Sequence, residues 1–139
     1  MDTVILSGLD ASKALYKSLE DRINYLKDKN ITPGLAAVLV GNNPASEIYV
    51  RNKTKKFDSL GLKTNLFRLD ENVSEKELLS LIQDLNSNND FHGILIQLPL
   101  PKHVNSEKVL NAIIPTKDVD GFHPENAGLL SIGKPRFIP

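Results

Sequence analysis

Two short, nearly unbroken apolar runs constrain the fold of this chain more than any other feature of its sequence. They occupy residues 35–40 and 93–97, and the second run ends in an amide side chain. Continuous apolar runs of this length are typical of strands that are buried on both faces of a parallel sheet. Because parallel strands must be joined by crossover connections, the segments between them should contain helices. The sequence therefore predicts the α/β class, with a mostly parallel sheet flanked by helices.

The segments nearest the first run carry two helical patterns and one further strand. A helix is predicted from Asp10, as its N-cap, to about Asp28, with one buried stripe at spacings of three and four. The stripe consists of Leu15, Leu19, Ile23 and Leu26. A second helix is predicted over residues 45–60, closed by Gly61, and an alternating strand over residues 64–69.

Two more helices are predicted on either side of the second run. Ser74 and Glu77 form a capping box that begins a third helix. Its buried face should consist of Leu78, Ile82 and Leu85. Asn105 or Ser106 caps a fourth helix. Val109, Leu110 and Ile113 should point inward from it, and a tail that contains glycine and proline follows.

Size and charge narrow the classes of function. The 139 residues are too few for two ordinary domains, so residues 1–139 are expected to form one. Seventeen Lys and Arg balance 17 Asp and Glu, which argues against a nucleic-acid partner and favours a small molecule. Without cysteine, disulfides and thiolate metal sites are excluded. No stretch approaches the ~20 apolar residues that span a membrane, so a cytoplasmic protein is expected.

Lys53 interrupts the apolar row of the second predicted helix. Tyr49, Lys53, Phe57 and Leu60 follow one another at spacings of four, four and three, and so share one face. Lys53 could pack its stem on the core with its ammonium in water, or the buried stripe could be centred to one side. Alternatively, a lysine held beside a phenol in a partly dry site could act as an acid or base. The spacing alone is compatible with both interpretations.

Gln97 is a polar amide at the end of the second run. In open α/β sheets, ligands bind beyond the carboxyl ends of the strands, where this amide and the following prolines should lie. The other interpretation is that Gln97 only ends the strand or bonds a loop. The prolines at positions 99 and 101 exclude continued central pairing, so the chain must turn out of the sheet there.

Asp118 and Asp120 lie two residues apart in a turn-like segment that ends in Gly121. Such a pair can form Asx-turns, bind a cation or orient a heterocycle through its ring nitrogens. A metal site is not expected, because the histidines at positions 92, 103 and 123 lack ligand spacing. A dinucleotide site is not expected either, because neither a G-x-G-x-x-G nor a phosphate-binding loop with its lysine occurs.

Three segments together carry a family resemblance. They are G-N-N-P-A-S-E-I-Y-V-R-N-K-T-K-K at residues 41–56, G-I-L-I-Q-L-P-L-P at residues 93–101, and P-T-K-D-V-D-G-F-H-P-E-N-A-G-L-L at residues 115–130. In this order and at these intervals, they resemble the signatures of the bifunctional methylenetetrahydrofolate dehydrogenase/methenyltetrahydrofolate cyclohydrolases. The resemblance covers essentially the whole chain and implies the amino-terminal, folate-binding catalytic domain.

The resemblance implies a substrate and a set of site residues. The substrate would be a tetrahydrofolate that carries a one-carbon unit, oxidised from methylene to methenyl with NADP and then hydrolysed to the 10-formyl product. Tyr49, Lys53, Gln97 and Asp120 fall on the family's catalytic positions, with Lys53 placed for the hydrolysis. The substrate-binding set also includes Ser46, Leu98 and Pro99.

The resemblance also implies what this chain does not supply. The family continues into a Rossmann nucleotide-binding domain that would bind NADP, so we expect the present domain to be truncated at its C-terminal end. The 139-residue chain should then lack dehydrogenase activity, while the full-length enzyme should be a homodimer. The alternative is a non-catalytic folate-binding or interaction module. The missing second domain favours this alternative, and the intact residue set argues against it.

Overall fold

The computed structural model describes residues 7–139. The chain forms two compact units, and the boundary between them lies between Pro33 and Gly34. Helix α1 (Gly8–Asp28) belongs to the first unit, and its N-cap is Ser7. The prediction that Asp10 caps this helix is wrong, because the Asp10 N–H itself donates to the Ser7 hydroxyl at 3.3 Å. Asp10 instead lies in the first turn, where a carboxylate interacts favourably with the helix dipole.

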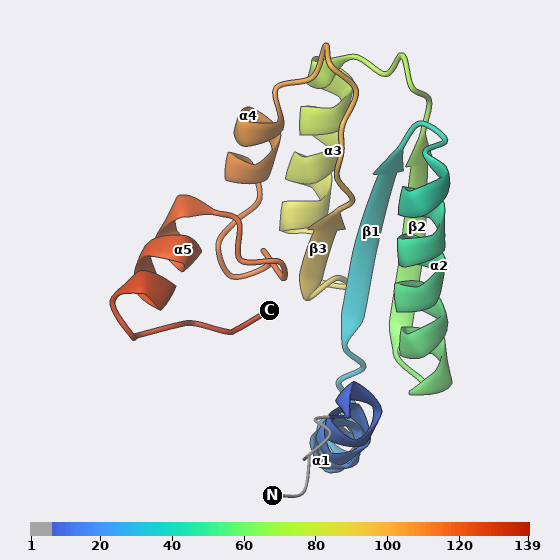
Figure 1. Cartoon of the computed structure of the whole chain (residues 1–139), viewed down its shortest axis with the longest axis vertical. Coiled ribbons are helices and arrows are strands. Elements are labelled where there is room, and N and C mark those ends of the chain that lie inside the picture. Colours follow the sequence, from blue (N-terminus) through green and yellow to red (C-terminus); the bar gives the residue numbers. More distant parts are fainter. Residues whose placement is uncertain (1–6) are drawn as a thin grey trace, which may run out of the picture. The chain divides into compact units, whose positions relative to one another are not determined.

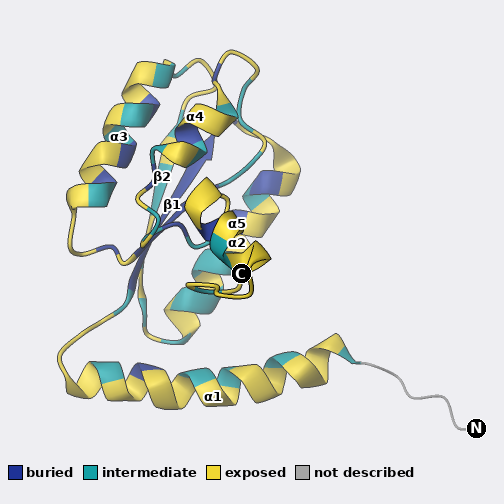
Figure 2. Ribbon diagram, turned by 90° about the vertical axis from the view of Figure 1, so that its left-hand side faces the viewer, coloured by how far each residue is buried: buried dark blue, intermediate teal, exposed yellow. Residues whose placement is uncertain are grey.

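The predicted buried stripe of α1 is only partly present. Ile23 is buried, Leu19 and Leu26 are half-buried, and Leu15 is 65% exposed. Figure 2 shows α1 as a mostly exposed helix. The periodicity does describe a helix, but residues 7–33, the described part of this unit, contain no second helix or strand on which a stripe could be buried.

Strand β1 (Gly34–Val40) is the centre of the sheet in the second unit, with β2 (Lys63–Leu69) on one side and β3 (Gly93–Ile96) on the other. Both pairings are parallel. Every residue of β1 and β3 is buried, whereas exposed and half-buried residues alternate along much of β2. The parallel α/β sheet predicted from the two apolar runs is therefore confirmed.

Helices cover both faces of this sheet (Figure 1). Helix α2 (Pro44–Ser59) packs on the face that carries Leu35, Ala37 and Leu39. Helices α3 (Glu75–Ser87) and α4 (Ser106–Asn111) pack on the other. The capping box of α3 is confirmed, and Asn105 caps α4.

Helix α5 (Pro124–Ser131) was not predicted. It lies in the segment where the sequence analysis expected only a tail that contains glycine and proline, so that expectation is corrected. Local signals for the helix do exist, since Pro124 occupies the first turn and Glu125 follows it. However, the helix is short, contains Gly128, and lacks a regular apolar stripe. No helix among residues 7–139 is long and apolar enough to cross a membrane.

Candidate functional site

The predicted site residues come from three segments of the second unit. Ser46, Tyr49 and Lys53 lie on α2, and Gln97 follows β3 directly. The third segment approaches β3 through a parallel bridge between Ile94 and Asp118. Gln97 therefore lies at the carboxyl end of a strand, where ligands bind in open α/β sheets.

Close packing holds the third segment against β3. The Ile94 N–H donates to the Lys117 carbonyl at 2.7 Å. A Cβ on Gly93 would lie 2.4 Å from the Val119 Cγ1, so glycine leaves the space that the Val119 side chain occupies. Gly121 then turns the chain with φ of +68°. Asp120 stands between these two constrained points.

Lys53 and Asp120 form the central charged pair of the site. The Lys53 Nζ lies 4.0 Å from the Asp120 Oδ1, and the two side chains are 42% and 29% exposed. Burial raises the pKa of Asp120, the Lys53 charge opposes that rise, and the nearby Asp118 adds to it. The carboxylate is thus partly desolvated without a close, fully formed ion pair.

Lys53 lies beside the buried stripe of α2 rather than within it. The residues of α2 that are buried are Ser46 and Val50, with Phe57 packed against the same core. This arrangement agrees with the interpretation that the stripe is centred to one side. Tyr49 is 61% exposed, and its ring is available to solvent. Lys53 and Tyr49 are therefore more exposed to solvent than the interpretation of a partly dry site requires, because they lie at the edge of the packed face of α2.

The hydrogen bonds of Gln97 agree with the interpretation that it ends the strand and bonds a loop, and they leave one of its atoms unpaired. Its backbone N–H continues the ladder by donating to the Val38 carbonyl at 2.9 Å. Its side-chain Nε2 donates to the Leu98 carbonyl at 2.8 Å. The same carbonyl also accepts from the Ser46 hydroxyl at 3.3 Å. Among the described residues, its Oε1 is buried without a hydrogen-bond partner. A buried acceptor without a donor is uncommon, and it points to a ligand or a moving side chain.

Leu98 and Pro99, the proposed apolar wall, differ in their surroundings. Leu98 is half-buried and fixed through its carbonyl, whereas Pro99 is exposed. Pro99 lines a pocket of about 330 Å³ together with Val40 and Glu71. Within residues 7–139, no three His, Asp or Glu side chains gather as a metal site would require.

The two carboxylates of the acidic segment have different roles. Asp118 is 2% exposed, and its Oδ2 accepts from the His123 N–H at 2.8 Å and from the Asn126 Nδ2 at 2.9 Å. Asp118 is thus a buried structural acceptor, although its backbone donor lies five residues on and the bond is not an Asx-turn. Asp120 remains the carboxylate that could bind a cation or a heterocycle. Sequence reasoning missed Asn126 and Arg136, which bind behind Asp118. The only local signal was their position in and after the third motif.

Comparison with known proteins identifies the family. Residues 6–120 match the model of the tetrahydrofolate dehydrogenase/cyclohydrolase catalytic domain. The chain belongs to this family. It is 50% identical over 135 residues to the bifunctional protein FolD of Lactococcus lactis subsp. cremoris, covering 97% of this chain and 47% of that protein. It is also 50% identical over 139 residues to the FolD of Ligilactobacillus salivarius, covering 100% and 49%.

Solved structures of the family agree with this assignment. The Campylobacter jejuni FolD dehydrogenase/cyclohydrolase superposes with a TM-score of 0.89 at 44% identity, covering 94% of this chain and 46% of that one. The Trypanosoma brucei enzyme, solved with NADP and an inhibitor, gives 0.92 at 32% identity, covering 100% and 48%. The chain therefore spans about half the length of the relatives it matches.

The start of α2 does not fit the phosphates of a nicotinamide dinucleotide. A helix N-terminus after a β-strand is the usual place for its phosphates. At the start of α2, however, the Asn43 side chain already accepts from the Ala45 and Ser46 N–H groups at 3.0 and 3.1 Å. This turn also lacks the second glycine of a dinucleotide motif.

Proposed function

We propose that this chain supplies the folate site of a methylenetetrahydrofolate dehydrogenase/methenyltetrahydrofolate cyclohydrolase. The observation that carries the proposal is the pairing of Lys53 with Asp120, which lie 67 positions apart in the sequence and belong to two different family motifs. Together with the unpartnered Gln97 Oε1, the pair offers a base, a cation and an acceptor within one edge of the sheet.

Asp120 is the group proposed to bind the pterin. A carboxylate can accept two hydrogen bonds, here from the amino group and a ring N–H of the pterin, and this contact fixes the plane of the ring. The rigid backbone on both sides of Asp120 supports this role, because a positioned acceptor loses little entropy on binding. The exposed ring of Tyr49 offers a surface on which a flat ligand can stack.

Lys53 is the group proposed to move a proton during hydrolysis. The methenyl carbon is already cationic, so water needs little activation, but it must lose a proton as it attacks, and a ring nitrogen must gain one. Gln97 cannot titrate, and its free Oε1 can accept a hydrogen bond from the Lys53 ammonium and so hold it in place.

The dehydrogenase step requires a hydride acceptor. We propose that NADP is held by a second domain and that the full-length enzyme is a homodimer, both from the family resemblance. The 139-residue chain should accordingly form no reduced nicotinamide from methylenetetrahydrofolate, measured by absorbance. Formation of reduced nicotinamide by the chain alone would contradict this division of labour.

Calorimetric titration with tetrahydrofolate, under anaerobic and reducing conditions, tests the proposal directly. The chain should bind tetrahydrofolate, and Asp120→Ala should weaken binding by about 1–3 kcal/mol because polar partners lose their contact. A matched control exists at the start of β2, where the exposed Asp90 pairs with Lys63 at 2.8 Å. Asp90→Ala removes a similar charge pair far along the strands from the site and should leave affinity unchanged.

Each outcome of this titration has a clear meaning. Absence of binding to the unaltered chain would refute the folate site, and equal effects of Asp120→Ala and Asp90→Ala would refute the pterin contact. Folate binding without any hydrolysis of methenyltetrahydrofolate, in a protein that joins this chain to a nucleotide-binding domain, would instead identify a non-catalytic folate-binding module.

A further inference from the structure

A hydrogen-bonded chain of polar side chains lies behind the acidic segment. It begins at Asp118, whose buried carboxylate accepts from the Asn126 Nδ2 at 2.9 Å. The same Nδ2 donates to the Pro115 carbonyl at 2.8 Å. The Asn126 Oδ1 accepts from the Arg136 Nη1 at 2.6 Å. Asn126 is 5% exposed, so its three contacts are largely shielded from water.

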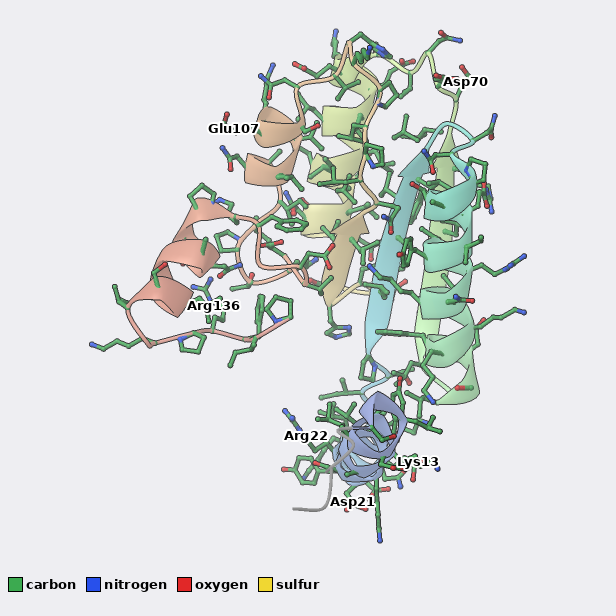
Figure 3. The ribbon with its side chains drawn as sticks, in the orientation of Figure 1. Lys13, Asp21, Arg22, Asp70, Glu107 and Arg136 are labelled. Atoms are coloured by element: carbon green, nitrogen blue, oxygen red, sulfur yellow. The ribbon has the colours of Figure 1, made fainter. Side chains whose placement is uncertain are left out.

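Arg136 ends this chain at the surface, where Figure 3 shows it beside α5. Its second nitrogen, Nη2, pairs with Glu125 at 2.5 Å, and its side chain is 31% exposed. The guanidinium therefore has two separable contacts, one that leads inward through Asn126 and one that ends at an exposed carboxylate. Lys53 and Asp120 are not among its partners.

The orientation of these bonds makes each one strengthen the next. The guanidinium draws electron density toward the Asn126 Oδ1, which makes the Asn126 N–H groups better donors to the Asp118 carboxylate. Without such partners, a carboxylate as buried as Asp118 would be costly to keep. These hydrogen bonds thus fix Asp118. A single residue, Val119, joins Asp118 to Asp120, and Val119 is itself packed against Gly93.

We infer that Asn126 and Arg136 are positioning residues, which act through Asp118 to hold Asp120 in the orientation that binds folate. This inference rests on the proposed folate site. A displacement of the Asp118 carboxylate would be passed to Asp120, because the only residue between them, Val119, is packed against Gly93. Arg136 would therefore influence ligand affinity without touching the ligand.

The test is a double-mutant cycle on tetrahydrofolate affinity in the 139-residue chain. Arg136→Gln should weaken binding roughly three- to tenfold, within the range of coupling between residues of one network. In the Asp120→Ala background, the same exchange should have almost no further effect, because the contact it orients is already lost. Arg136→Lys, which keeps the charge and one donor toward Asn126, should restore part of the affinity.

Two controls separate positioning from general damage. Glu125→Gln removes only the exposed partner of Arg136 and should leave affinity unchanged. Arg68→Gln removes a different arginine–glutamate pair, with Glu47, and should also have no effect. Circular dichroism establishes whether each variant is folded at the temperature of the titration.

The remaining outcomes overturn the inference. An unchanged affinity of Arg136→Gln would do so, as would an equal loss with and without Asp120. If Arg136→Gln and Arg136→Lys both fail to fold, Arg136 is required for the fold and does not act as a positioning residue. If the unaltered chain binds no tetrahydrofolate, the proposed function itself fails, and that result is seen before any variant is compared.

Discussion

The edge proposed to bind folate, with Lys53, Asp120 and Gln97, and the network of Asp118, Asn126 and Arg136 behind it use polar groups in opposite ways. In the network, Asp118, Asn126 and Arg136 have their side chains joined by hydrogen bonds of 2.6–2.9 Å. At the site edge, Lys53 and Asp120 are 4.0 Å apart, and among the described residues the Gln97 Oε1 has no partner. The structure thus satisfies the groups that hold the acidic segment and leaves unsatisfied the groups that could meet a ligand.

This difference indicates which substitutions should affect stability and which should affect chemistry. A group with saturated hydrogen bonds contributes to the folded state, and its loss leaves buried partners unpaired. A group with unused hydrogen-bonding capacity contributes little to folding, and its loss is felt when the ligand arrives. Functional sites commonly carry such a cost in stability.

The largest expected effect comes from Lys53→Met. In a protein that joins this chain to a nucleotide-binding domain, hydrolysis of methenyltetrahydrofolate should fall at least about 100-fold, as for the loss of a general acid–base group. The melting temperature should barely change, because Lys53 makes no close ion pair. The decay of methenyl absorbance measures the rate.

Lys63→Met is the matched control for this exchange, because Lys63, at the start of β2, also pairs with an aspartate, Asp90. It should leave hydrolysis at the rate of the unaltered protein. If Lys53→Met hydrolyses its substrate equally fast, the proposed role of Lys53 is wrong.

Asp118→Ala should have the next largest effect, this time on stability. It leaves the His123 N–H and the Asn126 amide without their acceptor in a buried setting. The free energy of unfolding should fall by about 2–3 kcal/mol, measured by urea denaturation of the 139-residue chain. Asp90→Ala, at an exposed position, should change it little. Equal effects of the two exchanges would show that burial of Asp118 does not matter.

The sequence predicted the parts of this molecule that depend on local signals. The parallel sheet, the Ser74 capping box and the Asn105 cap follow from apolar runs and cap residues that can be seen within a few positions. Helix α5 was missed because it is short and its pattern is interrupted by Gly128.

The polar network could not be predicted from the sequence for a different reason. Asp118 and Asp120 have the same chemistry and nearly the same neighbours, and only the bridge to β3 and the return of α5 decide which of them is buried. Arg136 reaches Asn126 across ten positions and outside any regular element. Such contacts depend on tertiary structure, whereas the four proposed catalytic positions were assigned from the family motifs.

Ser46→Ala should have a smaller effect than Asp118→Ala. It removes the hydroxyl that donates to the Leu98 carbonyl, but the Gln97 Nε2 still donates to that carbonyl. No acceptor is left unpaired, so unfolding free energy should fall by only about 0.5–1.5 kcal/mol. Ser59→Ala, which removes an exposed hydroxyl bonded to the Lys56 carbonyl, is the control and should cost less. A larger loss for Ser59→Ala would contradict this ranking.

The smallest expected effect is a gain of stability in Asp120→Asn at neutral pH. Because burial raises the pKa of Asp120, the folded chain holds this proton more tightly than the unfolded chain, where the pKa is near 3.8. Stability therefore falls as pH rises from that value through the raised pKa, and the loss persists above it. An amide has no charge to desolvate, so the variant should be slightly more stable at pH 7, and the difference should disappear on acidification below the ordinary pKa.

Asp90→Asn should show the opposite sign, which makes the comparison sharp. The hydrogen bond from Lys63 lowers the pKa of Asp90, so its charged form supports folding above the ordinary carboxyl pKa, and that support is lost as pH falls. Asp90→Asn should therefore be slightly less stable than the unaltered chain at pH 7. Urea denaturation of both variants between pH 3 and pH 7 measures the two trends. If Asp120→Asn were also less stable at pH 7, attraction to Lys53 would outweigh burial, and Asp120 would stabilise the fold as the network residues do.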